Sequence, residues 1–368
     1  MKIIADKNIP YLKGIAEYFG ETTYLDGSEF THDSIKDADT LIVRTVTYFG
    51  EEILKDTDVN LICSATIGYD HIDTEYCDTH NIAWHNAPGC NSGSVQQYII
   101  SSLITLSRNK GFELKGKTIG IIGVGNVGKK VAKACQILGM KVLLNDPPRQ
   151  IAEKDNSFVS LDIIIEQADI ITFHTPLTKE GEFKTFHLAD DIFFSSLKKK
   201  PIIINSARGG IVDTEAIKRA LNDNKISGAV IDCWENEPQI DIEYMNMVDI
   251  ATPHIAGYSA DGKANATRMS LESIANFYHL NKEPIKQIEV PEPKNKFIDI
   301  NNFSSDNRIY DVILATYNPL DDFARLKESP NRFKQLRNEY PLRREYVAYT
   351  VLNATQEERK TLNDLGFH

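Results

Sequence analysis

The sequence predicts an α/β fold built on a Rossmann-type, doubly wound parallel sheet, and two observations lead to this prediction. Short segments rich in Ile and Val alternate with helical patterns along most of the 368 residues, which is typical of a parallel sheet covered by helices. The second observation is the stretch from Lys117 to Asp146, KTIGIIGVGNVGKKVAKACQILGMKVLLND. Its pattern predicts a strand, a glycine-rich turn, a helix and a second strand, in that order.

The glycine-rich turn has the spacing G-x-G-x-x-G, formed by Gly123, Gly125 and Gly128. In a dinucleotide site the first glycine permits a tight turn, the second lets the backbone approach the pyrophosphate, and the third lets the helix pack on the strand. The pyrophosphate would lie at the helix N-terminus, where unpaired N–H groups favour an anion. A bare glycine pattern also occurs by chance, so a flavodoxin-like unit without a dinucleotide is the alternative.

The acid at the end of the second strand, Asp146, follows Gly128 by eighteen residues. A carboxylate at this position would accept hydrogen bonds from the ribose hydroxyls and repel a 2′-phosphate. The sequence therefore predicts NAD as the cofactor. Arg149 is the one neighbour that argues for NADP.

The elements on either side of this stretch continue the alternation of strands and helices. Residues 1–92 are predicted to hold strands in KIIAD, TLIVR, NLICSA and NIAWHN, and helices over Ile9–Tyr18 and Glu51–Asp56. Later elements are helices over Ser94–Ser107, Ser160–Ala168, Thr214–Asn222 and Lys263–Leu280, and strands over Asp169–Phe173, Pro201–Asn205 and GAVID.

The C-terminal part begins with a passage rich in proline and charge, Glu283 to Lys296, which reads as a linker. Beyond it we expect a small α+β domain, with strands in KFIDI and EYVAYTV and helices around Phe323–Lys327, Arg332–Glu339 and TQEERKTLNDLG. About seventy residues are marginal as an independent domain. We therefore expect this domain to bury a face on a partner.

Composition excludes several classes of protein. The net charge of −11 argues against a nucleic-acid partner. No apolar run reaches eighteen residues and no signal peptide is evident, so neither a membrane span nor secretion is expected. The five cysteines are odd in number and form no CxxC pair, so neither disulfides nor a metal site is predicted and a cytoplasmic location fits best.

Three residues at predicted strand ends suggest chemistry, since open α/β sheets bind ligands at that edge. Arg208 in INSARGG offers a guanidinium that can hold a carboxylate with two parallel hydrogen bonds. His254 in TPHIAGY is suited to remove a hydroxyl proton, and Glu237 in WENEP can orient and charge-balance it. The alternatives are a surface arginine on a turn and a structural histidine.

Taken together, GVGNVG with Asp146, HTPLT, INSARGGIVD, the segment from Asp232 to Pro238 and TPHIAG resemble the NAD-dependent D-2-hydroxyacid dehydrogenases. The resemblance implies that Arg208, Glu237 and His254 are the catalytic set. It also implies a flavodoxin-like substrate domain (1–92 and 263–285) interrupted by the NAD-binding domain (93–262), followed by a dimerisation domain (286–368). The cofactor contacts it implies are Gly123, Gly125, Asn126, Val127, Gly128, Asp146, Thr175, Ser206, Ala207, Arg208, Asp232 and Gly257.

Further segments resemble one branch of that family. They are LIVRTVTYF, NDPPR, AGYSADGK and a tail containing RNEYPLRREY and ending in LGFH. In that branch the tail makes a homodimer, and the substrate is a 2-hydroxy acid with a phosphate at its far end, oxidised during synthesis of pyridoxal 5′-phosphate. The substrate contacts that we predict are Arg44 and Thr45 at the end of the strand in TLIVRTVT, Thr66 at the end of LICSAT, and Tyr258, four residues past His254. Thr45 stands where that branch is expected to have serine.

Arg44 is the predicted phosphate ligand, because Arg208 should be occupied by the carboxylate. The alternative is that Arg44 pairs with an acidic neighbour such as Asp39, in which case Arg343 and Arg344 of the tail are the next candidates. Two other functions remain open. One is a sister activity on 3-phosphoglycerate, although the tail has too few strands for a regulatory βαββαβ domain. The other is a non-catalytic NADH-sensing scaffold.

Overall fold

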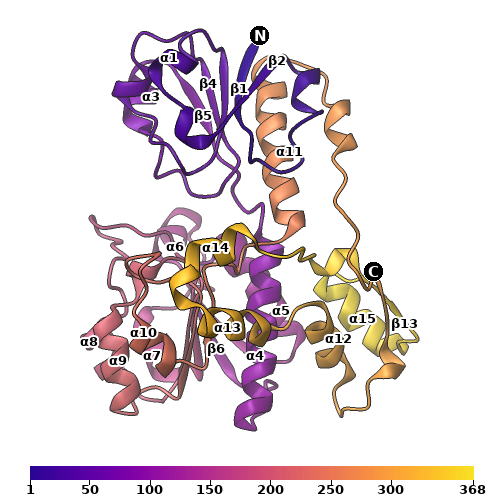
Figure 1. The fold of residues 1–368 in the computed structure, drawn as a ribbon. Coiled ribbons are helices and arrows are strands. Elements are labelled where there is room, and N and C mark those ends of the chain that lie inside the picture. The colour runs from indigo at the N-terminus through magenta and orange to yellow at the C-terminus, as the bar shows by residue number, and fades with distance from the viewer. The chain divides into compact units, whose positions relative to one another are not determined.

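The computed structural model describes residues 1–368, which form two compact units (Figure 1). Unit 1 contains Met1–Asn91 and Ser259–Glu292, and unit 2 contains Ser92–Tyr258 and Pro293–His368. The chain therefore leaves unit 1 once and returns to it. No helix is both long and apolar enough to cross a membrane.

Unit 1 is built on a five-stranded parallel sheet in the order β2-β1-β3-β4-β5, the flavodoxin-like order. Its strands are β1 Lys2–Asp6, β2 Glu21–Leu25, β3 Thr40–Val43, β4 Leu61–Ser64 and β5 Ala83–His85. Its helices are α1 His32–Ile35, α2 Glu51–Leu54, α3 Thr74–Thr79 and α11 Ala260–Phe277. The sequence analysis did not predict β2.

The helix predicted over Ile9–Tyr18 is wrong. Only a 3₁₀ turn, Ala16–Tyr18, forms there. Tyr11 and Gly14 take positive φ angles of 63° and 90°, and a right-handed helix cannot pass through such residues.

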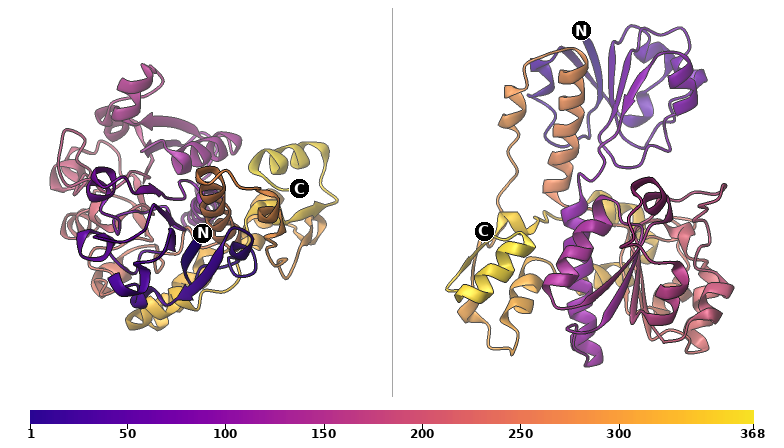
Figure 2. Two further views of the ribbon diagram at one scale, coloured as in Figure 1. Left: turned by 90° about the horizontal axis from the view of Figure 1, so that it is seen from above. Right: turned by 180° about the vertical axis from the view of Figure 1, so that it is seen from behind.

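The returning helix α11 completes the core of unit 1. Ser259 is the N-cap residue of α11, and its side chain accepts a hydrogen bond from the N–H of Gly262 (2.8 Å) in the first turn of the helix. Ala264, Leu271 and Ile274 are buried in the same apolar cluster as strands of the sheet. Figure 2 shows α11, in orange, beside those strands. Residues about two hundred positions apart in the chain thus share one core.

Unit 2 contains a six-stranded, all-parallel sheet in the order β11-β10-β9-β8-β6-β7. The strands are β6 Thr118–Ile122, β7 Lys141–Asn145, β8 Ile170–Phe173, β9 Ile202–Asn205, β10 Gly228–Ile231 and β11 Ile250–Ala251. The strand order reverses between β6 and β8, which creates the crevice where doubly wound sheets bind ligands. The predicted fold class is confirmed.

The helices of unit 2 follow the predicted alternation, with some additions. They are α4 Ser92–Lys110, α5 Asn126–Ile137, α6 Pro147–Glu153, α7 Leu161–Gln167, α8 Asp191–Ser196, α9 Thr214–Asn222 and α10 Ile242–Met247. Helix α6 was not predicted. It starts at two prolines, which suit a first helical turn, and the Asp146 side chain accepts from the N–H of Arg149 (3.2 Å) as its cap.

The tail forms β12 Phe297–Asp299, α12 Arg308–Thr316, α13 Pro319–Glu328, α14 Phe333–Asn338, β13 Thr350–Leu352 and α15 Gln356–Leu365. Strands β12 and β13 make a small parallel pair. The strand predicted over EYVAYTV is mostly wrong, because Tyr346–Ala348 is a 3₁₀ turn. Helix α12 was not predicted.

The tail is continuous with the core of unit 2. Helices α12 and α13 lie against α4, and α15 lies against α5 (Figure 1). Val312, Ile313 and Leu362 are buried in the same apolar cluster as Tyr98 and Leu103 of α4. The tail therefore packs as part of the nucleotide-binding unit. Its assignment to a separate dimerisation domain (286–368), and the other predicted domain boundaries, stay predictions.

Candidate active site

The glycine-rich turn follows β6 and packs against the end of β8, at the crevice of unit 2. Gly123 has φ +86°, and a Cβ there would lie 2.7 Å from backbone atoms of His174 and Thr175, which follow β8. A Cβ on Gly128 would lie 2.1 Å from the carbonyl oxygen of Gly123. No larger residue fits either position, as the predicted roles require.

The start of α5 has the features of an anion site. Its N-cap residue is Gly125, which has no side chain to cap the first N–H groups, and a Cβ there would meet nothing within 4 Å. Two hydroxyls at neighbouring strand ends, Thr175 Oγ1 and Ser206 Oγ, are buried and have no hydrogen-bond partner. Buried polar groups without partners are rare in folded proteins. These groups fit a polar cofactor, and all of them were predicted as NAD contacts.

Asp146 lies beside the glycine-rich turn, with its carboxylate accepting from the N–H groups of Val124 (2.8 Å) and Arg149 (3.2 Å). The Arg149 guanidinium is directed elsewhere. Its Nε and Nη2 each donate to the Glu153 carboxylate at 2.7 Å, and its Nη1 donates to the Val124 carbonyl. The residue that argued for NADP is thus already paired with an acid.

His254 and Glu237 form the central pair of the site. His254 Nδ1 donates to Glu237 Oε2 at 2.7 Å, and Glu237 Oε1 accepts from the N–H of Trp234 at 2.8 Å. Burial raises the pKa of Glu237, but the hydrogen bonds from His254 and Trp234 and the nearby charge of Arg337 outweigh it and leave the pKa below its ordinary value. Glu237 is therefore an anion at neutral pH. The bond at Nδ1 leaves Nε2 of His254 to act on a substrate.

The loop that carries His254 is held by Asp232, whose carboxylate is 0% exposed. It accepts hydrogen bonds from the N–H of Ile255 (2.7 Å), the N–H of Ala256 (3.0 Å) and the hydroxyl of Thr252 (2.6 Å). Burial is the largest influence on the Asp232 carboxyl and raises its pKa. Asp232 positions the loop. Its predicted contact with the cofactor stays a prediction.

The same loop is held from its other side by Arg343 of the tail, which is 5% exposed. Its guanidinium donates to the carbonyls of Ile255 (3.2 Å), Ala256 (2.9 Å) and Ser94 (2.5 Å), to Ser94 Oγ (2.8 Å) and to Gln97 Oε1 (3.0 Å). Sequence reasoning considered Arg343 only as a reserve phosphate ligand. Its donors are instead committed to backbone near His254, a role that no local pattern reveals.

Arg208 follows β9 and lies at the same edge of the sheet as Glu237 and His254. Its Nη1 donates to the carbonyl of Ala207 (2.8 Å), and its own carbonyl accepts from Asn205 Nδ2 (2.9 Å). A Cβ on Gly209 would lie 2.0 Å from the Trp234 carbonyl, so the Arg208 turn packs directly on the segment leading to Glu237. All three predicted catalytic residues therefore follow adjacent strands, β9, β10 and β11. Gly257 and Tyr258 follow them on the His254 loop.

The predicted substrate contacts in unit 1 follow β3 and β4. Arg44 forms a two-pronged ion pair with buried Asp6 (Nε–Oδ2 2.9 Å, Nη2–Oδ1 3.1 Å). The alternative that Arg44 pairs with an acidic residue is therefore confirmed, but the partner is Asp6 and not Asp39. Thr45 is exposed, and Thr66 Oγ1 donates to the Gly68 carbonyl (2.9 Å). Their contact with substrate stays a prediction.

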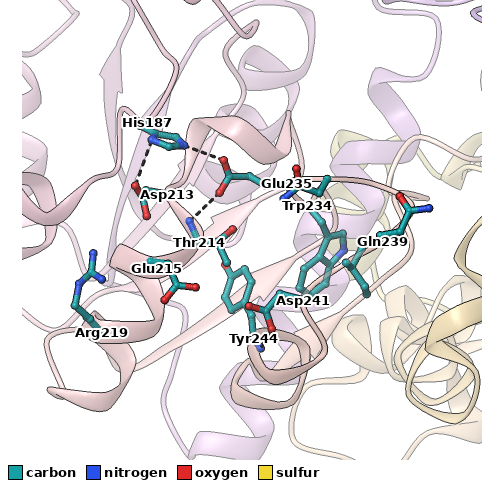
Figure 3. A pocket seen from close by; sticks show the side chains of 12 residues that line it. His187, Asp213, Thr214, Glu215, Arg219, Trp234, Glu235, Gln239, Asp241 and Tyr244 are labelled. Atoms are coloured by element: carbon teal, nitrogen blue, oxygen red, sulfur yellow. Dashed lines mark hydrogen bonds and ion pairs between the residues drawn. The ribbon is translucent and has the colours of Figure 1, made fainter.

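Unit 2 has a separate pocket of about 420 Å³ that contains none of the predicted site residues (Figure 3). His187 bridges Asp213 (3.2 Å) and Glu235 (2.8 Å), and Glu235 accepts from the N–H of Thr214 (3.0 Å). Glu235 is only two residues from Glu237, yet the two carboxylates serve different histidines. The bonds around Glu235 join the loop after β10 to the start of α9.

Fold and site together define an NAD-dependent dehydrogenase of the 2-hydroxyacid class. Residues 95–256 match the family described as D-isomer specific 2-hydroxyacid dehydrogenase, NAD binding domain, which confirms the NAD prediction. Residues 290–366 match a domain of unknown function.

Curated relatives narrow the class. The chain is 52% identical to an erythronate-4-phosphate dehydrogenase of Bacteroides thetaiotaomicron, over 96% of this chain and 99% of the relative. It is 46% identical to one of Porphyromonas gingivalis, with 100% of both chains covered. The chain belongs to the erythronate-4-phosphate dehydrogenase family, the branch that its sequence motifs indicated.

Solved structures of related dehydrogenases have the same fold. The NAD⁺-bound 3-phosphoglycerate dehydrogenase of Entamoeba histolytica is 28% identical with a TM-score of 0.64, covering 79% of this chain and 99% of its own. The D-lactate dehydrogenase of Aquifex aeolicus, in complex with NAD and lactic acid, is 25% identical with a TM-score of 0.60, covering 80% of this chain and 100% of its own.

The position of Asp146 predicts the choice of cofactor. The wild type should have a higher kcat/KM with NAD than with NADP. Asp146→Asn keeps a capping oxygen but removes the charge that repels a 2′-phosphate. The ratio of kcat/KM with NAD to kcat/KM with NADP should therefore fall by about tenfold or more. Steady-state kinetics with both cofactors measures this. If the wild type prefers NADP, Arg149 must leave Glu153 to bind the phosphate, and Arg149→Ala should then abolish the preference.

The contacts of Arg343 predict that the tail supports catalysis through the His254 loop. Arg343→Met should remove five buried hydrogen bonds that join the tail to the His254 loop and α4, lower the free energy of unfolding by on the order of 3 kcal/mol and reduce kcat. Thermal denaturation and steady-state kinetics are the measurements. Arg332→Met is the matched control, because Arg332 bonds only Gln335 and Glu339 at the surface of the tail. An Arg343→Met enzyme with normal kcat would show that the loop holds its geometry without the tail.

Proposed function

We propose that the protein oxidises 4-phospho-D-erythronate to 3-hydroxy-2-oxo-4-phosphooxybutanoate, a step in the synthesis of pyridoxal 5′-phosphate. The observation that carries the proposal is the pair of His254 and Glu237, joined at 2.7 Å, at a strand edge shared with Arg208. The names of the full-length relatives supply the substrate.

The roles of the three residues follow from their chemistry. Arg208 binds the carboxylate of the substrate and so fixes C2 and its hydroxyl. His254 takes the hydroxyl proton at Nε2 while the bond between C2 and its hydrogen breaks. NAD, when bound at the glycine-rich turn, would supply the hydride acceptor. Glu237 stabilises the imidazolium through the bond at Nδ1 and keeps the ring in the tautomer that leaves Nε2 unprotonated beforehand.

The remaining predicted substrate contacts, Arg44, Thr45, Thr66 and Tyr258, are proposed to bind the hydroxyls and the phosphate. Arg44 has a limit in this role, because Asp6 already neutralises its charge.

The alternative substrate is 3-phosphoglycerate, which also carries a hydroxyl beside a carboxylate and a phosphate at the other end. The tail argues against it, since β12 and β13 are its two strands and a βαββαβ domain needs four. NADH formation with the two substrates side by side decides between them. A higher kcat/KM for 3-phosphoglycerate would overturn the proposal. Turnover of either substrate would exclude the alternative that the protein is a non-catalytic, NADH-sensing scaffold.

The His254–Glu237 pair predicts a graded loss of activity. His254→Ala should lower kcat by about 10²–10⁴-fold while NADH binding is retained, because the base is removed and the nucleotide contacts are not. Glu237→Gln should cost less, since it removes charge but keeps the shape and a hydrogen bond. Steady-state kinetics and fluorescence titration of NADH measure the two effects. A His254→Ala enzyme within threefold of the wild type would contradict the assignment.

We also propose a homodimer formed through the tail. Phe297 on β12 is 63% exposed and Leu352 on β13 is 41% exposed. The outer side of β13 is covered by the C-terminal residue, whose carbonyl accepts from the N–H of Val351 (3.1 Å), so the open edge of the pair is that of β12. Exposed apolar side chains on an open sheet edge favour association with a second copy.

The exposed strand pair predicts the effect of charge on assembly. Phe297→Lys with Leu352→Lys should convert the dimer to a monomer, because two lysines at this edge would face their copies across the interface. Sedimentation velocity measures the result. Ile192→Lys is the control, since Ile192 is 74% exposed on α8, outside the tail. A double variant that remains dimeric would place the interface elsewhere.

A further inference from the structure

Arg337 on α14 is half-buried, yet no hydrogen bond or ion pair joins its guanidinium to another residue. Its Nε is buried and makes no hydrogen bond. Arg308 pairs with Glu358 and Arg325 with Asp322, while Arg343 has five acceptors. The Nε of Arg337 has therefore lost water without gaining a hydrogen bond, which is costly for a charged group.

The position of Arg337 is in the candidate active site. Its guanidinium carbon lies 5.4 Å from the centre of the Tyr258 ring, on the loop that carries His254. Tyr340 packs edge-on against the same ring, with the centroids 5.9 Å apart, and so supports this arrangement. The positive charge of Arg337 is also close enough to Glu237 to contribute to the lowered pKa of that carboxyl. Tyr258 was predicted to contact the substrate, and Arg337 adds a cation beside it.

A purely electrostatic role toward Glu237 does not account for this arrangement. The two oxygens of Glu237 accept from His254 and from the N–H of Trp234, and neither accepts from Arg337. The guanidinium instead keeps its planar set of donors beside an aromatic ring, an arrangement suited to an anion with several oxygens.

The other predicted phosphate ligand is less suited to a doubly charged group. Nε and Nη2 of Arg44 are bonded to the carboxylate of buried Asp6, so a phosphate there would compete with that carboxylate for the donors of the guanidinium. A phosphate monoester carries nearly two negative charges at neutral pH. It is bound best by a guanidinium whose donors are not already bonded to a carboxylate.

We propose that Arg337 is a substrate-binding residue whose guanidinium binds the phosphate of the substrate beside Tyr258, which makes the tail part of the specificity site. This inference rests on the proposed function, because it assumes a phosphorylated 2-hydroxy acid. Arg208 keeps the carboxylate, so the two ends of the substrate are bound by two different arginines of unit 2.

The test compares 4-phosphoerythronate with erythronate in Arg337→Ala, Arg337→Lys and Arg44→Ala enzymes. Arg337→Ala should lower kcat/KM for 4-phosphoerythronate by about 10- to 150-fold, mainly through KM, and change erythronate by less than threefold. Arg337→Lys should recover part of the loss, because it restores the charge without the planar fork. Arg332→Ala is the matched control on the same part of the tail and should match the wild type.

The outcomes separate the possible roles. An equal loss for both substrates, with a shifted pH profile of kcat, would mean that Arg337 acts through Glu237, and the inference is wrong. A selective loss in Arg44→Ala but not in Arg337→Ala would assign the phosphate to Arg44 instead.

A binding measurement separates this inference from the proposed function. Inorganic phosphate should bind the NADH-loaded wild type in isothermal titration calorimetry, and at least tenfold more weakly to NADH-loaded Arg337→Ala. If the wild type does not oxidise 4-phosphoerythronate but this difference is found, the proposed substrate is wrong and Arg337 is still an anion ligand. If phosphate binds both proteins equally, the inference fails whatever the substrate. Thermal denaturation of each variant confirms that it is folded.

Discussion

The buried carboxylate of Asp232 is the constraint on which the rest of the site depends. It accepts two backbone N–H groups and one hydroxyl from the loop after β11, and that loop carries His254. His254 itself takes a positive φ of 55°, a conformation that needs support from its surroundings. Without these bonds the carboxylate would lie in an apolar interior at a cost of several kcal/mol. Asp232 and the loop therefore hold each other in place.

Arg343 supplies the complementary half of this support. Asp232 binds the N–H groups of Ile255 and Ala256, and Arg343 binds the carbonyls of the same two residues. The arginine is buried without a carboxylate in contact, stacked 4.0 Å from the centre of the Tyr317 ring. Neutral carbonyl dipoles and an aromatic face thus replace a counter-ion. The tail also shares its core with α4 and α5, and this packing holds Arg343 in place against the loop that carries His254.

Charge at the strand edge follows a consistent pattern. Anionic ligands are expected at the uncapped start of α5 and at Arg208, while the acidic groups Glu237 and Asp146 accept N–H groups of the protein. Each acid therefore has its partners before any ligand arrives. The chain has a net charge of −11, yet its site offers donors and cations where phosphates and carboxylates must bind.

The sequence by itself determined the features that depend on neighbouring residues. The glycine spacing, the strand and helix on either side of it and the acid at Asp146 form a local unit, since each glycine is needed for contacts within about fifty residues. The parallel sheet of unit 2 follows from the same alternation, whereas the order of its strands was given only by the structure. Arg208, Glu237 and His254 were predicted to lie together because each follows a predicted strand, and the structure places them after three adjacent parallel strands, which end at one edge of the sheet.

Only the tertiary structure decided how distant residues pair. Arg44 bonds Asp6 rather than Asp39 because β1 and β3 are neighbours in the sheet, which brings residues 38 positions apart together. Arg343 reaches Gln97 across 246 positions, and Arg337 reaches Tyr258. The helix expected over Ile9–Tyr18 failed because backbone angles at Tyr11 and Gly14 override the apolar period. Such long-range pairs leave no periodic signal in the sequence, since their spacing is determined by the fold and not by any single element.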